Sequence, residues 1–200
     1  MRVSLPYRLR MPALLMMSVM AVSAAQEQTM DPARVTVVVR ADQPLRAGAW
    51  TALTDALARS LEGADGRPGE RIELMRAEDV RPGLEVDRMV LVMLHGDCTL
   101  WPGPRVNVSG ALGWVPRRHG RIEPFIHVEC GRIVQMLAPR ALALRPAERE
   151  TVMAAAVARV VEHEWVHIAT QSAAHSEHGV MQGQFTVLDL LEDAERAQNR

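Results

Sequence analysis

The first two thirds of the chain contain short apolar segments of the kind that form strands, each bounded by charged residues, glycine or proline. The run RVTVVVR is rich in β-branched residues, and RMVLVML is almost continuously apolar, as expected of a central strand covered on both faces. The predicted strands cover residues 34–40, 71–76, 88–94, 112–115 and 124–128, and a polar turn at 117–121 joins the last two.

Helical spacing marks the remaining segments. One apolar face is formed by Trp50, Leu53, Leu57 and Leu61. Gly63 then stops this helix, and a second, long helix is predicted from Pro146, because proline suits the first helical turn. Thr186 followed by Asp189 predicts the N-cap of a final helix that runs to about Gln198. This order of strands and helices suits a small α+β domain.

Residues 1–25 have the features of an export signal. Arg2, Arg8 and Arg10 precede an apolar run, and small residues offer cleavage after Ala24 or Ala25. The apolar run is short for a membrane span, which disfavours the alternative of an uncleaved anchor. We therefore expect a secreted or periplasmic protein with one domain over 26–200 and no stable membrane insertion. No obvious propeptide fits between Ala25 and the first strand at Arg34, so we expect no self-inhibiting segment.

Charge and cysteine content narrow the possible partners. Cleavage removes three arginines and no acids, so the net charge becomes 20 − 24 = −4, which disfavours nucleic acid as a partner. Cys98 and Cys130 are the two cysteines, and in an exported chain such a pair predicts a disulfide worth about 3–4 kcal/mol. Thiolate ligands to zinc are the alternative. We expect a monomer.

The stretch HEWVHIATQSAAH, residues 163–175, carries the candidate chemistry. His163 and His167 stand four residues apart, so one helical face projects both imidazoles in the same direction, as two ligands of one zinc ion require. Glu164 is adjacent and suited to act as a general base. Apolar neighbours such as Val160 and Trp165 predict a buried helix, in which these polar groups need a partner.

The longer stretch HEWVHIATQSAAHSEHGVM resembles the zinc site of the metzincins, and within them the matrixin-type metalloproteases. Their motif is H-E-x-x-H-x-x-G-x-x-H, followed by a methionine that makes a turn beneath the zinc. Residues 112–130 resemble the edge strand and following strand that border a matrixin cleft, and residues 185–195 resemble its C-terminal helix. The resemblance implies a small zincin-like α+β domain with a mixed twisted sheet, an active-site helix and bound Zn²⁺.

The chain departs from that motif after its second histidine. Thr170 stands where the family has glycine, and Ala173 stands where its third histidine falls. Two extra residues allow a wider return of the chain, which makes His175 the expected third ligand. The helix is then expected to end near 170–172. His178, or a carboxylate on the following helix such as Glu192, is the alternative third ligand.

The groups around the ligands are less specific. Met181 is expected to pack under the metal site or to be a plain core residue, and His178 to be a second-shell group or an oxyanion donor. With His175 as a ligand, the nitrogens of the three histidines should converge to within about 3–4 Å. His95, His119 and His127 have no motif around them and are expected to be structural or surface residues.

These patterns predict an exported zinc metalloendopeptidase that acts on peptide or protein substrates. Zinc on His163, His167 and His175 would polarise the peptide carbonyl and activate a water, and Glu164 would move the proton to the leaving amine. The peptide would lie along the edge strand near 112–115. The alternative is a disulfide-stapled exported binding domain, which holds zinc for stability or has lost catalysis.

Overall fold

The computed structural model describes residues 34–62, 64 and 71–191. The predicted export signal, residues 1–25, lies outside the described residues. The same holds for Gly63, for Glu192 and for the rest of the predicted C-terminal helix beyond residue 191.

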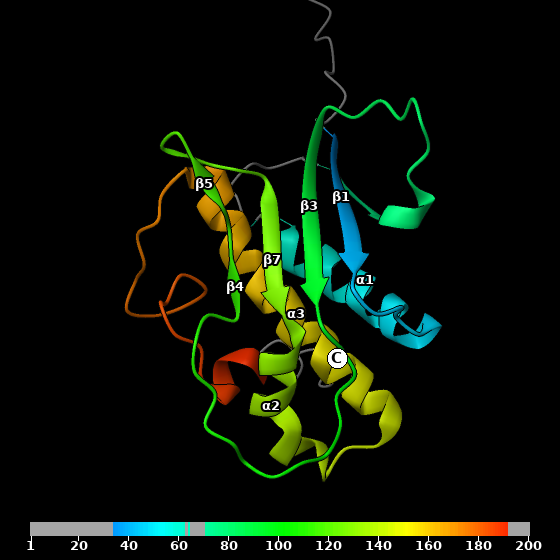
Figure 1. Cartoon of the computed structure of the whole chain (residues 1–200), viewed down its shortest axis with the longest axis vertical. Helices are drawn as coiled ribbons and strands as arrows, with labels where there is room; N and C mark the ends of the chain where they lie inside the picture. Colours follow the sequence, from blue (N-terminus) through cyan, green and yellow to red (C-terminus); the bar gives the residue numbers. More distant parts are fainter. Residues whose placement is uncertain (1–33, 63, 65–70, 192–200) are drawn as a thin grey trace, which may run out of the picture. The chain divides into compact units, whose positions relative to one another are not determined.

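A mixed five-stranded sheet forms one layer of the domain, in the order β2-β1-β3-β7-β4 (Figure 1). Four strands run parallel, and β4 runs antiparallel to β7 at the sheet edge, with Gly113 opposite Val128. The strands are β1 (Arg34–Ala41), β2 (Arg71–Arg76), β3 (Arg88–His95), β4 (Gly113–Trp114) and β7 (Phe125–Glu129). All five coincide with segments that the hydrophobic pattern predicts, and the α+β class with a mixed sheet is confirmed.

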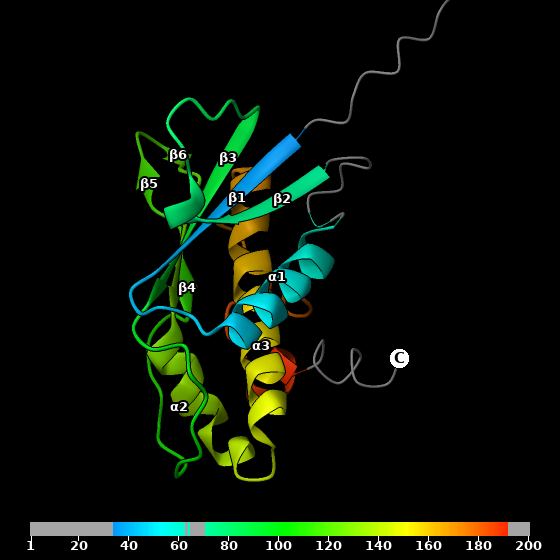
Figure 2. The ribbon, with the colours of Figure 1, turned by 90° about the vertical axis from the view of Figure 1, so that its right-hand side faces the viewer.

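Two long helices, α1 (Ala47–Leu61) and α3 (Pro146–Thr170), cover the same face of this sheet (Figure 2). The predicted apolar face of α1 is buried: Leu53, Leu57 and Leu61 are at most 4% exposed. Proline at the start of α3 fits its first turn, and Glu148 closes the turn by accepting a hydrogen bond of 2.7 Å from the Arg145 backbone N–H. The core therefore lies between the sheet and this pair of helices.

The strand and helix pattern missed a third helix, α2 (Cys130–Ala141). Its buried face follows helical spacing through Ile133, Leu137 and Ala141. Gly131 and Pro139 look like breakers in the sequence, but Gly131 falls in the first turn, and Pro139 lies near the C-terminal end, where it gives up one helical hydrogen bond and the helix ends two residues later.

The predicted polar turn at 117–121 is a small hairpin instead of a simple loop. It pairs β5 (Arg117–Arg118) with β6 (Arg121–Ile122), and Gly120 takes a φ of +80° that a residue with a side chain resists. The predicted start of the final helix is confirmed, since Thr186 and Asp189 exchange hydrogen bonds before a helical segment at 187–191.

The predicted disulfide is confirmed. Cys98 and Cys130 are bonded, with Cα atoms 4.8 Å apart, and the bond fastens the loop after β3 to the first residue of α2. Such a bond is compatible with an extracellular or periplasmic location. Within the part of the chain that the structure describes, no helix is both long enough and apolar enough to cross a membrane.

Candidate metal centre

The last three turns of α3 place three polar side chains in the interior. His163, Glu164 and His167 are 6%, 5% and 5% exposed, although they belong to the residue types that are usually partnered or solvated. The i, i+4 spacing brings the two imidazoles together, with their Nε2 atoms 3.0 Å apart. Both histidines and the acid are therefore buried in one place, as the sequence predicts for this stretch.

Backbone carbonyls fix the orientation of both imidazoles. His163 Nδ1 lies 2.7 Å from the Val180 carbonyl oxygen, and His167 Nδ1 lies 2.6 Å from that of Ser172. A carbonyl can only accept a hydrogen bond, so each Nδ1 carries the proton and each Nε2 presents a lone pair. Metal-ligating histidines in proteins are held in this way, through the nitrogen that does not bind the metal.

Two lone pairs 3.0 Å apart repel each other unless a positive charge lies between them. A proton on His163 is a poor candidate for that charge at neutral pH. Burial lowers the pKa of His163 to about 4, against the Val180 hydrogen bond that raises it, and repulsion from His167 and His175 lowers it further. The arrangement of the two imidazoles therefore fits a metal ion.

A third histidine joins this pair from the loop after α3. Among the described residues, His163, His167 and His175 form the one group of three donors suited to hold a metal, with ligand atoms within 4.8 Å of one another. That bound is wider than the expected 3–4 Å. The His175 ring stacks on His163 at 5.2 Å between centroids and is exposed, so it forms the solvent side of the cluster. The donor set is three imidazoles, which zinc accepts.

The other residues predicted near the metal are His178, Met181 and Glu192, and the structure describes the first two of them. His178 is exposed and does not belong to this group of donors, and its carbonyl accepts a 2.6 Å hydrogen bond from Ser176. Met181 is half-buried, and its carbonyl accepts from the Ser176 N–H at 2.8 Å. The segment that resembles a methionine turn contacts the centre through Val180, which orients His163. The alternative ligand Glu192 lies outside the described residues.

Helix α3 ends without a glycine at its C-terminus. Gln171, one position after Thr170, takes the left-handed conformation with φ 53°. Its side-chain amide accepts a hydrogen bond of 3.0 Å from the Ile122 N–H and donates one of 3.1 Å to the Ile122 carbonyl. These bonds to β6 offset the strain of the left-handed backbone. The helix therefore ends where the sequence predicts, but the sequence analysis did not identify Gln171 as the residue that ends it.

Gly113 brings the edge strand against the acid of the centre. A Cβ atom there would lie 3.2 Å from Glu164 Oε1 and 2.6 Å from the Val160 side chain, so only glycine allows this approach. Burial raises the pKa of Glu164 to about 7. The sequence reasoning missed Gly113; its signal was a glycine inside a short predicted strand, which often marks a close approach of two segments.

A cleft of about 710 Å³ opens onto these side chains. Its walls include the outer strand β4 on one side and the loop after α3 on the other; among the residues that line it are Gly113, Trp114, Val160, His163, Glu164, His167, His175 and Phe185. In the sheet order β4 is the last strand, so among the described strands of that sheet its outer edge has no neighbour. The cleft therefore combines three metal donors, a buried acid and a strand edge.

Two of the histidines without a motif lie elsewhere on the sheet. His95 Nε2 and His127 Nδ1 are 2.9 Å apart, and Trp114 stacks on His127 with 4.6 Å between centroids. They extend from β3 and β7, outside the cleft. His119 is exposed in the turn between β5 and β6.

Comparisons of the chain with protein-family models, with curated proteins and with solved structures gave no match. The site must therefore be interpreted from its own geometry.

Proposed function

We propose that this chain is an exported zinc-dependent metalloendopeptidase of metzincin-like type, with Glu164 as its general base. The observation that carries the proposal is the pair of Nε2 lone pairs held 3.0 Å apart beside a buried carboxyl group in an open cleft. His163, His167 and His175 would hold the metal. A zinc ion there would supply Lewis acidity, polarising a carbonyl and making water a nucleophile near neutral pH.

Glu164 suits the transfer of a proton. Burial raises its pKa to about 7, near neutrality, where a carboxyl group can both take and give a proton. Its carboxylate would accept a proton from the attacking water and then deliver it to the amine of the leaving peptide. A neighbouring cation favours the ionised form, which keeps Glu164 a base at neutral pH.

The edge strand would position the substrate. An extended peptide can add to the free edge of β4 through backbone hydrogen bonds, which would place its scissile bond over the histidine cluster. Gly113 would let the chain of β4 lie close enough to α3 for Glu164 to reach the reacting water.

The alternative is an exported binding domain that keeps zinc only for stability. Burial of Glu164 argues against it, because a carboxyl group whose pKa is raised by burial costs folding stability and a purely structural metal site has no use for it. Catalysis gives that acid a reason to be there.

Substitution of Glu164 by glutamine separates the two functions. On the catalytic proposal, zinc-loaded E164Q should keep one zinc per chain and its melting temperature, while cleavage of a fluorogenic peptide mixture falls by about 10²–10⁴-fold. Glu177→Gln, an exposed acid two residues after His175, is the matched control and should cleave normally. Equal cleavage by E164Q and the parent, or no cleavage by the zinc-loaded parent, would refute the proposal in favour of the binding domain.

A further inference from the structure

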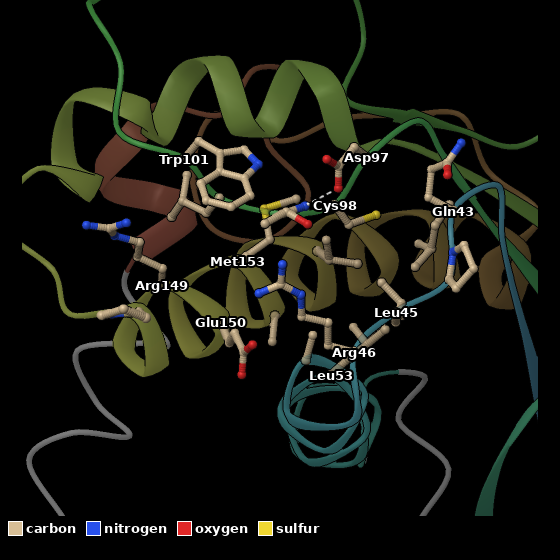
Figure 3. A pocket seen from close by; sticks show the side chains of 18 residues that line it. Gln43, Leu45, Arg46, Leu53, Asp97, Cys98, Trp101, Arg149, Glu150 and Met153 are labelled. Carbon is tan, nitrogen blue, oxygen red and sulfur yellow. Dashed lines mark hydrogen bonds between the residues drawn. The ribbon is translucent and has the colours of Figure 1, made fainter.

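A second cavity, of about 240 Å³, lies away from the histidine cluster, against the first half of α3 (Figure 3). Its walls come from the loop after β1, the loop after β3, the first turns of α1 and the start of α3. The apolar part of the lining includes Leu45, Leu53, Leu94, Leu100, Met153 and Val157. The proposed peptidase site uses none of these residues.

The cavity occupies a favourable place in the sheet. It lies at the carboxyl ends of β1 and β3, which are adjacent and parallel. The chain continues from β1 through α1 to β2 on one side, and from β3 towards β4 on the other side. Neighbouring parallel strands whose connections leave in opposite directions open a crevice at their carboxyl ends, and this is where open α/β sheets bind ligands.

One cation faces this crevice without a direct ion pair among the described residues. Arg46 extends from the start of α1 into the cavity (Figure 3), and among the described residues its guanidinium makes no hydrogen bond or ion pair, although its charge lowers the pKa of Asp97. By contrast, Arg149 Nε already donates to the carbonyls of Ala141 and Leu144, at 3.1 Å and 3.0 Å. Arg46 is therefore the lining cation available to a bound anion.

The acids that line the cavity are engaged with their own surroundings. The hydrogen bond from the Thr99 hydroxyl lowers the pKa of Asp97 and burial opposes it, while the Thr99 N–H, Trp101 and the charge of Arg46 lower it further. The Glu150 carboxylate lies against Gly48 in the first turn of α1, where a negative charge is favourable. Asp97 is a negative charge that already accepts hydrogen bonds, so it offers less to a bound anion than Arg46 does.

The wall that carries Trp101 is held in place before any ligand arrives. The disulfide joins Cys98 in this wall to Cys130 at the start of α2, and the Gly103 N–H donates to the Ala138 carbonyl at 3.1 Å. Leu100 between these anchors is 4% exposed. A preformed apolar pocket with few convergent polar groups is the usual form of a small-molecule site.

We propose that this cavity binds a small carboxylate with an apolar body, the carboxylate on Arg46 and the apolar part between α1, α3 and Trp101. At about 30 Å³ per water-sized unit, the volume suits a molecule of on the order of ten non-hydrogen atoms. A medium-chain aliphatic acid and the C-terminal residue of a peptide both have this chemistry.

Calorimetric titration of the zinc-loaded full chain tests the proposal, with four probes: octanoate, N-acetyl-L-leucine, octylamine and octanol. We expect at least one carboxylate to bind with 1:1 stoichiometry, and more tightly than octylamine and octanol. Arg46→Ala should weaken that binding by about 10–100-fold, the usual worth of a charge-assisted hydrogen bond. Arg81→Ala removes an exposed arginine outside the cavity and should leave the dissociation constant unchanged.

Larger side chains that fill the cavity provide a second test of the same proposal. Ala49→Phe changes a half-buried lining residue of α1 and should abolish binding of both carboxylates, with Met153→Phe as the substitute if the first variant does not fold. The stronger carboxylate identifies the source of the ligand, an aliphatic acid or a peptide C-terminus. Any of three results would overturn the proposal: the carboxylates fail to bind at millimolar concentration, octylamine or octanol binds as tightly as they do, or Arg46→Ala leaves the affinity unchanged.

Discussion

The two halves of α3 line two hollows that are built in different ways. The C-terminal half carries His163, Glu164 and His167, which lie within five consecutive positions, into a polar cleft. The N-terminal half presents Met153 and Val157 to an apolar cavity whose other walls come from distant loops. One site is therefore mostly local in sequence, and the other is assembled entirely by tertiary contacts.

This difference decides how visible each site is in the sequence. Buried histidines and a buried acid cost stability unless they have a partner, so their presence on an apolar helix indicates chemistry. A cavity lined by leucine, methionine and valine needs no unusual residue and looks like an ordinary core. Because the two sites share no lining residues, a substitution in one site should leave binding at the other unchanged, and the following experiments test this.

The largest effect is expected at the cleft. Loss of His175 should weaken zinc binding by more than about 100-fold, beyond the 10–100-fold that loss of a second-shell partner costs. His178→Ala should have a modest effect or alter only turnover, and Glu192→Gln should leave the metal bound. Competition with a chromophoric chelator measures all three. The dissociation constant of the carboxylate bound at Arg46 should be the same in His175→Ala as in the parent. If His178→Ala loses zinc and His175→Ala keeps it, His178 is the third ligand.

The reciprocal change is removal of the disulfide. The bond closes a loop with a sequence separation of 32, so replacement of Cys98 and Cys130 by serine should lower the free energy of unfolding by about 3–4 kcal/mol. Urea denaturation measures this loss. Because the bond anchors the wall of the apolar cavity, carboxylate affinity should fall more than zinc affinity in the variant. A larger loss of zinc than of carboxylate would mean that the two sites are coupled.

The third effect is a pH dependence confined to the cleft. Burial raises the pKa of Glu164 from 4.5 to about 7, so the folded, metal-free protein holds a proton that the unfolded chain releases above pH 4.5. The protonated Glu164 carboxyl group therefore contributes to the free energy of unfolding at low pH, and this contribution is lost as the pH rises through 7. Glutamine does not titrate, so chelator-treated E164Q should gain about 3 kcal/mol on the chelator-treated parent between about pH 5 and pH 8.

Denaturant titrations at several pH values measure that gain. His163, with its pKa lowered to about 4, has the opposite pH dependence, but it is present in both proteins and cancels in the difference. A stability difference that stays constant with pH would show that Glu164 is not buried as a protonated acid in the metal-free protein.

The smallest effect concerns the contact between β4 and α3. Gly113→Ala would place a Cβ 2.6 Å from the Val160 side chain and 3.0 Å from the His127 carbonyl oxygen. Overpacking of this kind should cost about 1–3 kcal/mol and reduce peptide cleavage by displacing Glu164, with zinc still bound. Gly131→Ala is the control, since an added Cβ there meets no atom within 4 Å. Equal stability losses in the two variants would count against a special role for Gly113.

Local rules accounted for much of the fold. Strand segments, the apolar face of α1, the proline start of α3 and the Thr186 cap all follow from patterns a few residues long, and the structure has them where the sequence predicts. Helix α2 was missed although Ile133, Leu137 and Ala141 show its spacing; Gly131 and Pro139 within the segment obscure that pattern, because both residues are typical of turns.

The sequence by itself determined that two imidazoles and a carboxyl group lie on one turn of helix, because the 3.6-residue period fixes which neighbours share a face. It also determined that its cysteines could pair. Only the tertiary structure brought His175 to the centre, set Gly113 against Glu164, ended α3 at Gln171 and opened a cavity beside Arg46. These arrangements join segments far apart in the chain, and their geometry depends on how loops close and layers pack, which no short stretch of residues encodes.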